Sequence, residues 1–556
     1  KNVSSDNYSW YARTFLGRSF DLKYVRLGLT VGVEYDAKRK TGNTIEFIGL
    51  PNDYILGPVG HGRSKGTTKV SESQNTFSMI LNPDFAVISG AAGDKYVFTP
   101  SLRPELSSVY GTKTKWDFNP SLAVRWNIYK ESFMKRLEFI NKMAIRASWG
   151  QVVKYKATRY DVWGTYDIKP DNTYGGESYI PIDFKTLPNA QLDPITTTSW
   201  NLGYELGLFN NRISLDVDAY YRQIDNQLST IATPDHSGFE EMKSTETSLV
   251  NYGLEFSLTG RPLPLQSDWD LTCNLNFAIN RDVVTKLPNE ARQILNQKAN
   301  IANKLGMNTT SLLMYINKGV YATDADVPVD PATGKRLRVG GNDTQDAYFK
   351  AGDPIWVDMN GDYIIDEKDK VIAGNIRPKV TGGFWINLSY KNFSVHTNAS
   401  FVLRRDIVNK VLADNLAAYT SPLKKKIDEL REKAALVPIG SYNFWTKEDP
   451  YNAVYPNPFD YTHANVIKPF RDDQTLFIED GSYFKINTVS LSYRFPKPWL
   501  DFFRLRSVVL KASVNNIYTF SGYSGISPES VNGLGRDNSG GYPNSRTWTV
   551  GVTIGL

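Results

Sequence analysis

The sequence is poor in the residues that most clearly mark a fold or a chemistry. A single cysteine among 556 residues excludes a framework of disulfide bonds within the chain. The mean hydropathy is −0.38 and there is no run of roughly eighteen apolar residues, which excludes a membrane-spanning helix. Neither sign of charge dominates, because 64 basic and 58 acidic residues leave a net charge of +6. The basic residues are scattered, whereas a nucleic-acid-binding surface needs a concentrated basic patch.

The chain also lacks the signatures of common enzymes. None of its four histidines, His61, His236, His396 and His463, has metal-ligand spacing with another histidine, cysteine or acidic residue. Neither a G-x-S-x-G nucleophile motif nor a P-loop occurs where a strand runs into a helix. We therefore expect that this protein is not an enzyme.

What the sequence does contain is strict two-residue alternation. Residues 546–556 read R-T-W-T-V-G-V-T-I-G-L, in which every second residue from Trp548 to Leu556 is apolar and those between are small or polar. This period puts the two sets on opposite faces of a β-strand. The segment has the length, roughly ten residues, that a tilted strand needs to cross a bilayer.

The same alternation recurs along the chain and predicts about twelve membrane-spanning strands, or thirteen if residues 8–15 form one. The predicted strands lie at residues 25–35, 122–128, 143–149, 200–208, 213–221, 252–258, 269–279, 384–390, 393–395, 489–495, 508–514 and 546–556. Residues 391–392 join two of them with the length of a two-residue hairpin turn.

The lengths of the connections favour a membrane barrel over a soluble sandwich. Short connections are expected at residues 209–212, 261–268, 391–392 and 496–506, with 129–142 intermediate. Long ones are expected at residues 36–117, 153–199, 223–251, 281–381, 403–482 and 518–545. Counted back from the C-terminus, all short connections fall on one side and all long ones on the other, as in bacterial barrels with short periplasmic turns. The predicted fold class is therefore all-β, an antiparallel transmembrane β-barrel with long extracellular loops.

Several segments resemble one family, the SusC/RagA-like TonB-dependent transporters of Bacteroidetes outer membranes. The resemblance rests on G-G-Y-P-N-S-R-T-W-T-V-G-V-T-I-G-L (540–556), F-I-E-D-G-S-Y-F-K-I-N-T-V-S-L-S-Y-R-F-P-K-P-W-L (477–500), A-S-V-N-N-I-Y-T-F-S-G-Y (512–523) and the acidic stretch at 356–383. Weaker similarity covers residues 116–126, 144–150 and 197–212, in the family's order. The first 115 residues match poorly, and Leu556 stands where a terminal Phe is commoner.

The resemblance implies a barrel of about 22 strands, the size class that holds a plug. Because only about twelve or thirteen strands are predicted here, we expect residues 1–556 to be the C-terminal part of such a barrel. The plug domain and the first strands are then not present in this chain. They are either cleaved or omitted, or a second polypeptide supplies them, which we expect since unpaired strand edges are costly in lipid.

The function that the resemblance implies is active import of a bulky nutrient, an oligosaccharide or an oligopeptide, across the outer membrane. The implied partners are a SusD-like surface lipoprotein that acts as a lid and TonB, which acts through the plug. Two alternatives remain open at this point, a passive outer-membrane porin and a soluble glycan-binding β-protein.

One stretch has the pattern of a metal site. Residues 358–369, D-M-N-G-D-Y-I-I-D-E-K-D, place oxygen ligands as an EF-hand-like calcium loop does. The predicted Ca²⁺ ligands are Asp358, Asn360, Asp362, Ile364 (through its carbonyl), Asp366 and Asp369. Tyr363 stands where such loops have glycine, and Asp369 stands where they have a bidentate glutamate. An acidic turn without metal is the alternative.

Two further sets are predicted to face the transported molecule, although ordinary structural roles would give the same pattern. Polar residues on the inner face of the strands are expected to line the lumen: Asp216, Asp218, Arg222, Glu255, Asn274, Asn276 and His396. Aromatic residues of the long connections could stack on sugars or grip peptide side chains: Tyr451, Tyr455, Phe459 and Tyr461.

Overall fold

The computed structural model forms two compact units, each described here by itself. The first unit comprises residues 1–254 and 282–292, and the second comprises residues 255–281 and 293–556. The structure describes residues 2–48, 63–88, 94–109, 116–165, 173–174, 177–178, 182, 184–264, 266–296, 300–309, 311–340, 344–420, 442–537 and 544–555.

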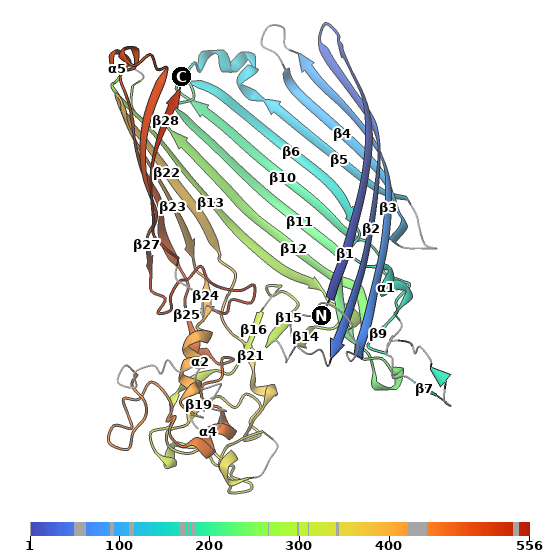
Figure 1. The fold of residues 1–556 in the computed structure, drawn as a ribbon, viewed down its shortest axis with the longest axis vertical. Coiled ribbons are helices and arrows are strands. Elements are labelled where there is room, and N and C mark those ends of the chain that lie inside the picture. Colours follow the sequence, from blue (N-terminus) through green and yellow to red (C-terminus); the bar gives the residue numbers. More distant parts are fainter. Residues whose placement is uncertain are drawn as a thin grey trace. The chain divides into compact units, whose positions relative to one another are not determined.

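The first unit is a sheet of long antiparallel strands in the order β1-β2-β3-β4-β5-β6-β10-β11-β12 (Figure 1). The strands are β1 (Asn2–Asp21), β2 (Val25–Ile48), β3 (Arg63–Ile88), β4 (Asp94–Ser107), β5 (Trp116–Asn127), β6 (Ile140–Lys154), β10 (Ile195–Leu208), β11 (Ile213–Ala232) and β12 (Glu241–Gly260). Residues 255–260 of β12 belong to the second unit. The smaller elements are α1 (Arg159–Trp163), β7 (Thr173–Tyr174), β8 (Glu177–Ser178) and β9 (Thr186–Leu187), which pairs with β12.

The second unit also contains a sheet of antiparallel strands, in the order β13-β22-β23-β26-β27-β28. The strands are β13 (Trp269–Lys286), β22 (Val380–Tyr390), β23 (Phe393–Leu403), β26 (Tyr483–Arg494), β27 (Ser507–Ser521) and β28 (Thr547–Gly555). Residues 282–286 of β13 belong to the first unit. Helix α5 (Lys497–Phe502) lies in the connection between β26 and β27.

Two long connections of the second unit fold into a body of their own, here called the loop module: the described residues of 300–379 and 404–482. Its elements are β15 (Ile301–Lys304), β16 (Ser311–Met314), β17 (Asn317–Val320), β18 (Arg338–Val339), β19 (Pro354–Trp356), β20 (Ile364–Ile365), β21 (Val371–Ile372), β24 (Asp406–Val408), β25 (Ile478–Asp480), α2 (Lys410–Ala418) and α4 (Tyr461–Ile467). Strand β14 (Gln293–Asn296) pairs with β15. Two apolar clusters, one around Phe444 and Phe477 and one around Phe349 and Trp356, form its core.

The described residues also form single 3₁₀ turns: η3 (Ile128–Lys130), η4 (Ser132–Arg136), η5 (Asp235–Ser237), η6 (Pro288–Glu290), η7 (Asp324–Asp326), η8 (Gln345–Ala347), η9 (Glu367–Asp369) and η11 (Thr475–Phe477). Among the described residues, no helix is both long enough and apolar enough to span a membrane.

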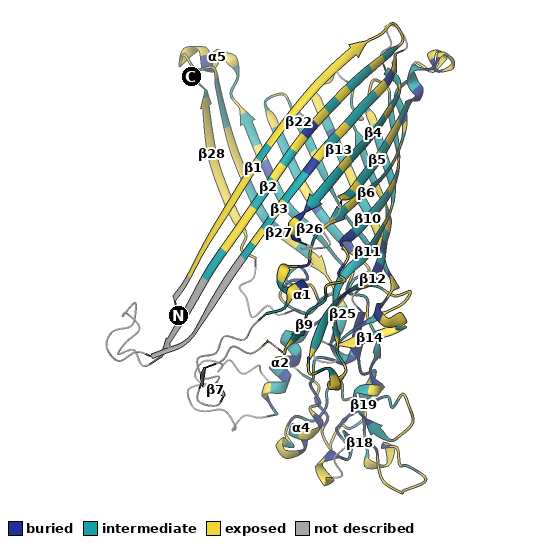
Figure 2. Ribbon diagram, turned by 90° about the vertical axis from the view of Figure 1, so that its right-hand side faces the viewer, coloured by how far each residue is buried: buried dark blue, intermediate teal, exposed yellow. Residues whose placement is uncertain are grey.

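The apolar face of the strands is the exposed one. On β10, Trp200 and Leu202 are 42% and 57% exposed, while Glu205 on the opposite face is only 5% exposed. Figure 2 shows exposed and less exposed residues interspersed along the strands inside the sheet, whereas the edge strands β1 and β28 are exposed along almost all of their described length. A soluble sandwich would bury this apolar face against a second layer. An outward apolar face and an inward polar one are the arrangement of a membrane barrel wall.

The predicted long connection at residues 36–117 is wrong. That stretch contains residues 36–48 of β2 and all of β3 and β4, and β3 pairs with β2 over residues 63–87 and with β4 over residues 76–88. The predicted connection at residues 223–251 is also too long, because β11 extends to Ala232 and β12 begins at Glu241. Short and long connections still alternate where they were predicted elsewhere, as at residues 391–392 and 404–482.

Candidate functional site

The polar face of the first unit contains a cluster of ionised side chains centred on Glu205 of β10. The Arg125 guanidinium of β5 donates to both Glu205 carboxylate oxygens, at 2.9 and 2.6 Å. From β6, Lys142 Nζ lies 2.8 Å and Arg146 Nε 3.4 Å from the same carboxylate. One buried carboxylate therefore joins three neighbouring strands.

The absence of a side chain at Gly203 leaves space for a second ion pair on this face. Arg146 Nη2 donates to Asp218 Oδ2 of β11 at 2.6 Å. A Cβ atom at Gly203 would lie 2.3 Å from Arg146 Nε and 2.7 Å from Asp218 Oδ1. Any larger residue would have to displace this ion pair.

The residues predicted to line a lumen all lie on strands, on the face opposite the apolar one. Asp218 pairs with Arg146, and Asn274 Nδ2 donates to Thr259 Oγ1 at 2.9 Å. Asn276 donates to Asn274, and His396 lies beside Trp385. Asp216 stands opposite Glu205, Arg222 opposite Ser199, and Glu255 lies on β12. A role for these side chains in binding a transported molecule stays a prediction.

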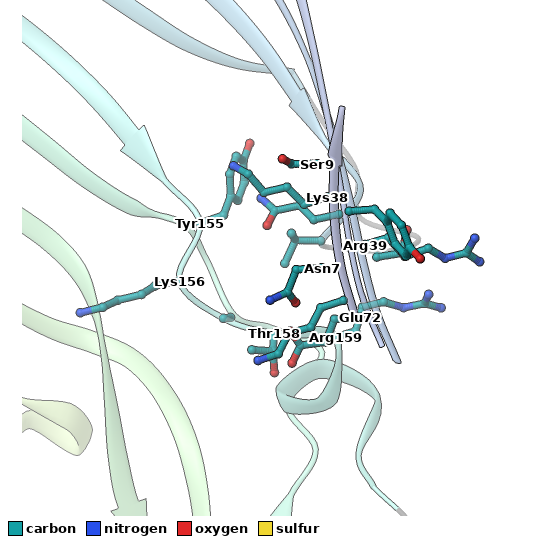
Figure 3. Close-up of a pocket in the computed structure, with 15 residues that line it drawn as sticks. Asn7, Ser9, Lys38, Arg39, Glu72, Tyr155, Lys156, Thr158 and Arg159 are labelled. Carbon is teal, nitrogen blue, oxygen red and sulfur yellow. The ribbon is translucent and has the colours of Figure 1, made fainter. Parts of the chain in front are cut away.

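A cavity of about 410 Å³ opens on the same unit where the strands approach the long connection after β6 (Figure 3). Its walls come from β1, β2, β3 and residues 155–159, and they are mostly polar or charged. The lining residues are Asn7, Tyr8, Ser9, Lys38, Arg39, Lys40, Glu72, Ser73, Gln74, Val109, Tyr155, Lys156, Ala157, Thr158 and Arg159.

The strand register builds the polar wall of this cavity. Ser9 stands opposite Lys38 and Asn7 opposite Lys40. Lys38 stands opposite Gln74 in turn, and Lys40 opposite Glu72. Directly opposite residues share a face of the sheet, and Figure 3 shows Lys38 directed toward Tyr155 while Arg39 points to the other side.

Two of the five cations that line the cavity have acidic neighbours. Lys38 Nζ lies 2.7 Å from Asp36 Oδ2, and Lys40 faces Glu72 across the strand pair. The Tyr155 hydroxyl donates to Asp117. Amide, hydroxyl and aromatic groups together suit a polar ligand held by hydrogen bonds.

The loop module is held together by a buried polar network. Gln474 is fully buried, and its Oε1 accepts from Trp356 Nε1 and from Asn317 Nδ2, each at 2.8 Å. Nearby, Lys370 Nζ lies 2.7 Å from Asp473 Oδ2, and Arg471 stacks over the Tyr315 ring at 4.5 Å. Burial opposes ionisation of Asp473, yet hydrogen bonds from Arg471 and Lys370 hold the pKa of Asp473 below its ordinary value.

His463 serves this module as a structural residue. Its Nε2 lies 2.7 Å from Asp353 Oδ2, and both side chains are buried. Burial raises the pKa of Asp353, and the hydrogen bond to His463 offsets part of that rise. His236 lies in η5, and His61 lies outside the described residues.

In the predicted calcium loop, the carboxylates bind backbone amides of the loop itself. Asp358 accepts from the amides of Gly361 and Tyr363, at 2.7 and 2.8 Å. Asp369 is fully buried and accepts from the amides of Met359 and Asp366, each at 2.8 Å.

The loop shows one feature of calcium-binding loops and lacks another. Tyr363 adopts φ +59°, the left-handed conformation that glycine supplies in such loops. Within the described parts of the chain, however, no cluster of three or more His, Cys, Asp or Glu side chains has the geometry to hold a metal. The carboxylates of Asp358 and Asp369 stand where the pattern puts ligands, and the calcium site stays a prediction.

The four loop aromatics have different environments. Tyr455 packs against the core of the loop module, and Phe459 lies 6.1 Å from Phe444, ring centroid to ring centroid. Tyr461 begins α4, and Tyr451 is 78% exposed. Only Tyr451 therefore presents most of its side chain to a ligand or a partner.

The comparisons with known proteins agree with this geometry. Residues 1–517 match the family described as TonB dependent receptor-like, beta-barrel. The chain is 26% identical over its whole length to TonB-dependent receptor P3 of Formosa agariphila, and it covers 52% of that protein. It is 26% identical to TonB-dependent receptor SusC of Bacteroides thetaiotaomicron over 83% of its length, covering 42% of that protein.

A solved structure shows the same fold. The RagAB peptide importer in its closed-closed state matches all of this chain with a TM-score of 0.76 at 18% identity, and 56% of that structure's chain is covered. The chain thus spans about half the length of the relatives it matches. By fold, by strand chemistry and by this match over residues 1–517, it belongs to the TonB-dependent receptor-like β-barrel family of the outer membrane.

Proposed function

We propose that this chain forms barrel wall and outer loops of a SusC-like active importer. The importer carries a bulky nutrient, an oligosaccharide or an oligopeptide, across the outer membrane with energy from TonB. A plug outside this chain and a SusD-like surface lipoprotein complete the transport complex. The expected chemistry is binding and release, so no residue is assigned a catalytic role.

The observation that carries the proposal is that strands inside the sheet, such as β10, have two faces of opposite character. Apolar side chains such as Trp200 and Leu202 are exposed on one face of β10, and the Glu205 ion cluster occupies the other. Lipid is the solvent that such an outer face fits, and a polar inner face fits a passage for a hydrated molecule.

The cavity beside Tyr155 supports a polar cargo. Its amide and hydroxyl groups, among them Asn7, Ser9 and Thr158, can bind either sugar hydroxyls or peptide groups. The RagAB relative is named a peptide importer, which supports the oligopeptide alternative. The loop module offers a folded outer surface against which a lid protein could close.

Uptake by whole cells tests the proposal. Cells that carry the full-length protein receive fluorescent oligosaccharides and oligopeptides, with and without TonB. We expect accumulation of one class, and we expect it to stop when TonB is removed. Uptake that continues without TonB would identify a porin, and extraction of the protein by plain buffer would identify a soluble protein.

A further inference from the structure

The short connection between β26 and β27 exposes a compact group of large aromatic side chains. Trp499, Phe502 and Phe503 are 62%, 82% and 61% exposed, whereas Leu500 is buried. Trp499 and Phe502, at i and i+3, share one face of α5, and the ring of Phe503, the residue that follows the helix, lies 5.0 Å from that of Phe502 by centroids. Leu500 anchors the opposite side.

Backbone hydrogen bonds fix this turn to the ends of the strands. The Leu505 amide donates to the Leu500 carbonyl at 2.9 Å, and the Phe495 amide donates to the Val508 carbonyl at 3.0 Å. The Arg506 amide donates to the Gly555 carbonyl of β28 at 2.9 Å. The exposed rings are therefore held in place and do not belong to a loose loop.

The rings extend an aromatic row that already runs along the lipid-exposed face. Phe393 and Tyr493 lie 4.6 Å apart by ring centroids, Tyr493 and Phe495 5.1 Å, and Phe495 and Trp499 6.4 Å. Trp269 and Tyr390 form a similar pair, 4.3 Å apart, near the same end of neighbouring strands. Bands of aromatic residues at strand ends mark the boundary between hydrocarbon and headgroups.

Cations surround the three rings. Arg494, Lys497, Arg504 and Arg506 are exposed, and Asp501 is the one acidic residue between them. In the part of the chain that the structure describes, none of these four cations forms a salt bridge. Figure 2 shows α5 largely exposed at the end of β28.

We propose that the α5 turn is an anchor that binds the phospholipid leaflet at the short-turn, periplasmic side of the outer membrane. Trp499, Phe502 and Phe503 enter the boundary between headgroups and acyl chains, as the apolar face of an interfacial helix does. Lys497, Arg504 and Arg506 bind the lipid phosphates. Two observations single out lipid as the partner: the rings continue the lipid-exposed face of the strands, and the charge is opposite to that of anionic headgroups.

Spin labels placed in the full-length protein test this anchor. Cys273 is the only cysteine of these 556 residues, so Cys273→Ser, with any cysteine of the remaining protein also replaced by serine, gives a background that accepts one label at Phe502→Cys. A matched label at Gln266→Cys occupies an exposed position in another short connection. The protein is reconstituted in vesicles of phosphatidylethanolamine and phosphatidylglycerol, and each label is exposed to oxygen and to a water-soluble nickel chelate.

We expect the ratio of oxygen to nickel accessibility to be several-fold higher at position 502 than at position 266. Replacing Arg504 and Arg506 by Gln should lower the ratio at 502 in phosphatidylglycerol vesicles and leave it unchanged in phosphatidylcholine alone. Equal ratios at the two positions would overturn the anchor. Because position 502 is so exposed, the label should not impair folding, and the result is independent of which molecule the protein transports.

Discussion

Both the oxygen and the nitrogen of the Gln474 side-chain amide form hydrogen bonds inside the loop module. Besides accepting from Trp356 and Asn317, its Nε2 donates to the carbonyls of Pro469 and Arg471, at 2.8 and 3.0 Å. Gln474→Met keeps the volume but leaves these groups without partners, and each buried unpaired group costs about 1–3 kcal/mol. We expect amide hydrogen exchange around Trp356 to become at least tenfold faster. Tyr451→Ala, at an exposed position, is the control and should change nothing.

Glu131 makes the stability of the first unit depend on pH. Its carboxylate accepts from Tyr96 Oη at 2.6 Å and Trp126 Nε1 at 3.0 Å, and lies 2.5 Å from Lys95 Nζ. The hydrogen bond from Lys95, followed by that from Tyr96, lowers the pKa of Glu131 from 4.5 to about 2. A lowered folded-state pKa stabilises the protein above the unfolded value, and this stabilisation disappears as pH falls through the folded value.

The matched measurement is the melting temperature of the wild type and Glu131→Gln between pH 7 and pH 2. The wild type should be the more stable protein above about pH 4.5, and the difference should shrink steadily toward about pH 2. A difference that is constant across this range would show that Glu131 is not ionised in these contacts.

At the scale of elements, Glu205 determines how three strands fit together. Glu205→Leu leaves Arg125, Lys142 and Arg146 facing one another without their common carboxylate. Hydrogen bonds to charged groups contribute about 1.5–3 kcal/mol each, but the cations are partly exposed, so we expect a loss of about 2–3 kcal/mol in total. Urea titration of the heat-modifiable gel shift measures it. Glu255→Gln, at an exposed position on the polar face of β12, should shift the midpoint very little.

Alternation in the sequence predicted most strands, and proline explains the two that it missed. Strand β4 contains Pro100 and Pro104, which stand opposite Leu122 and Phe118 of β5, and β3 contains Pro83. A proline within an alternating run argues against a strand because it cannot donate to the ladder. Here the outward-facing apolar residues on either side of each proline, such as Phe98 and Leu102 beside Pro100, stabilise the strand enough to offset the missing backbone donors.

The strand extensions were missed for a different reason. Residues 223–232 of β11 and 36–48 of β2 continue as strand, but their sequences no longer alternate cleanly between apolar and polar. A strand that leaves the bilayer no longer needs an apolar face, so the periodic signal ends before the strand does.

The candidate site could be predicted only in part. The two-residue alternation of this segment alone predicts that Asp216 and Asp218 lie on the polar face. That prediction does not require knowing which strands pair with it. The Glu205 cluster and the cavity beside Tyr155 depend on which residues stand opposite across strands, as with Lys38 and Gln74. That register is set by pairing over the whole sheet and cannot be read from one strand. The aromatic residues around α5 were visible in the sequence, but their exposure was not.

At the scale of the whole molecule, every conclusion depends on the solvent that covers the apolar face. Leu202 lies in the middle of β10 with its side chain on that face, while Asn201 is directed to the polar one. Arginine on the lipid-facing side near the bilayer midplane costs about 2–4 kcal/mol, whereas inner-face substitutions cost little. Leu202→Arg should therefore lower the free energy of unfolding in vesicles by about that amount, and Asn201→Arg should be nearly neutral. If water covered this face, the order of stability of the two variants would reverse. Arginine at the exposed position 202 would then be harmless, whereas arginine at the half-buried position 201 would destabilise the protein. The two variants, titrated side by side with urea in the same vesicles, decide between lipid and water.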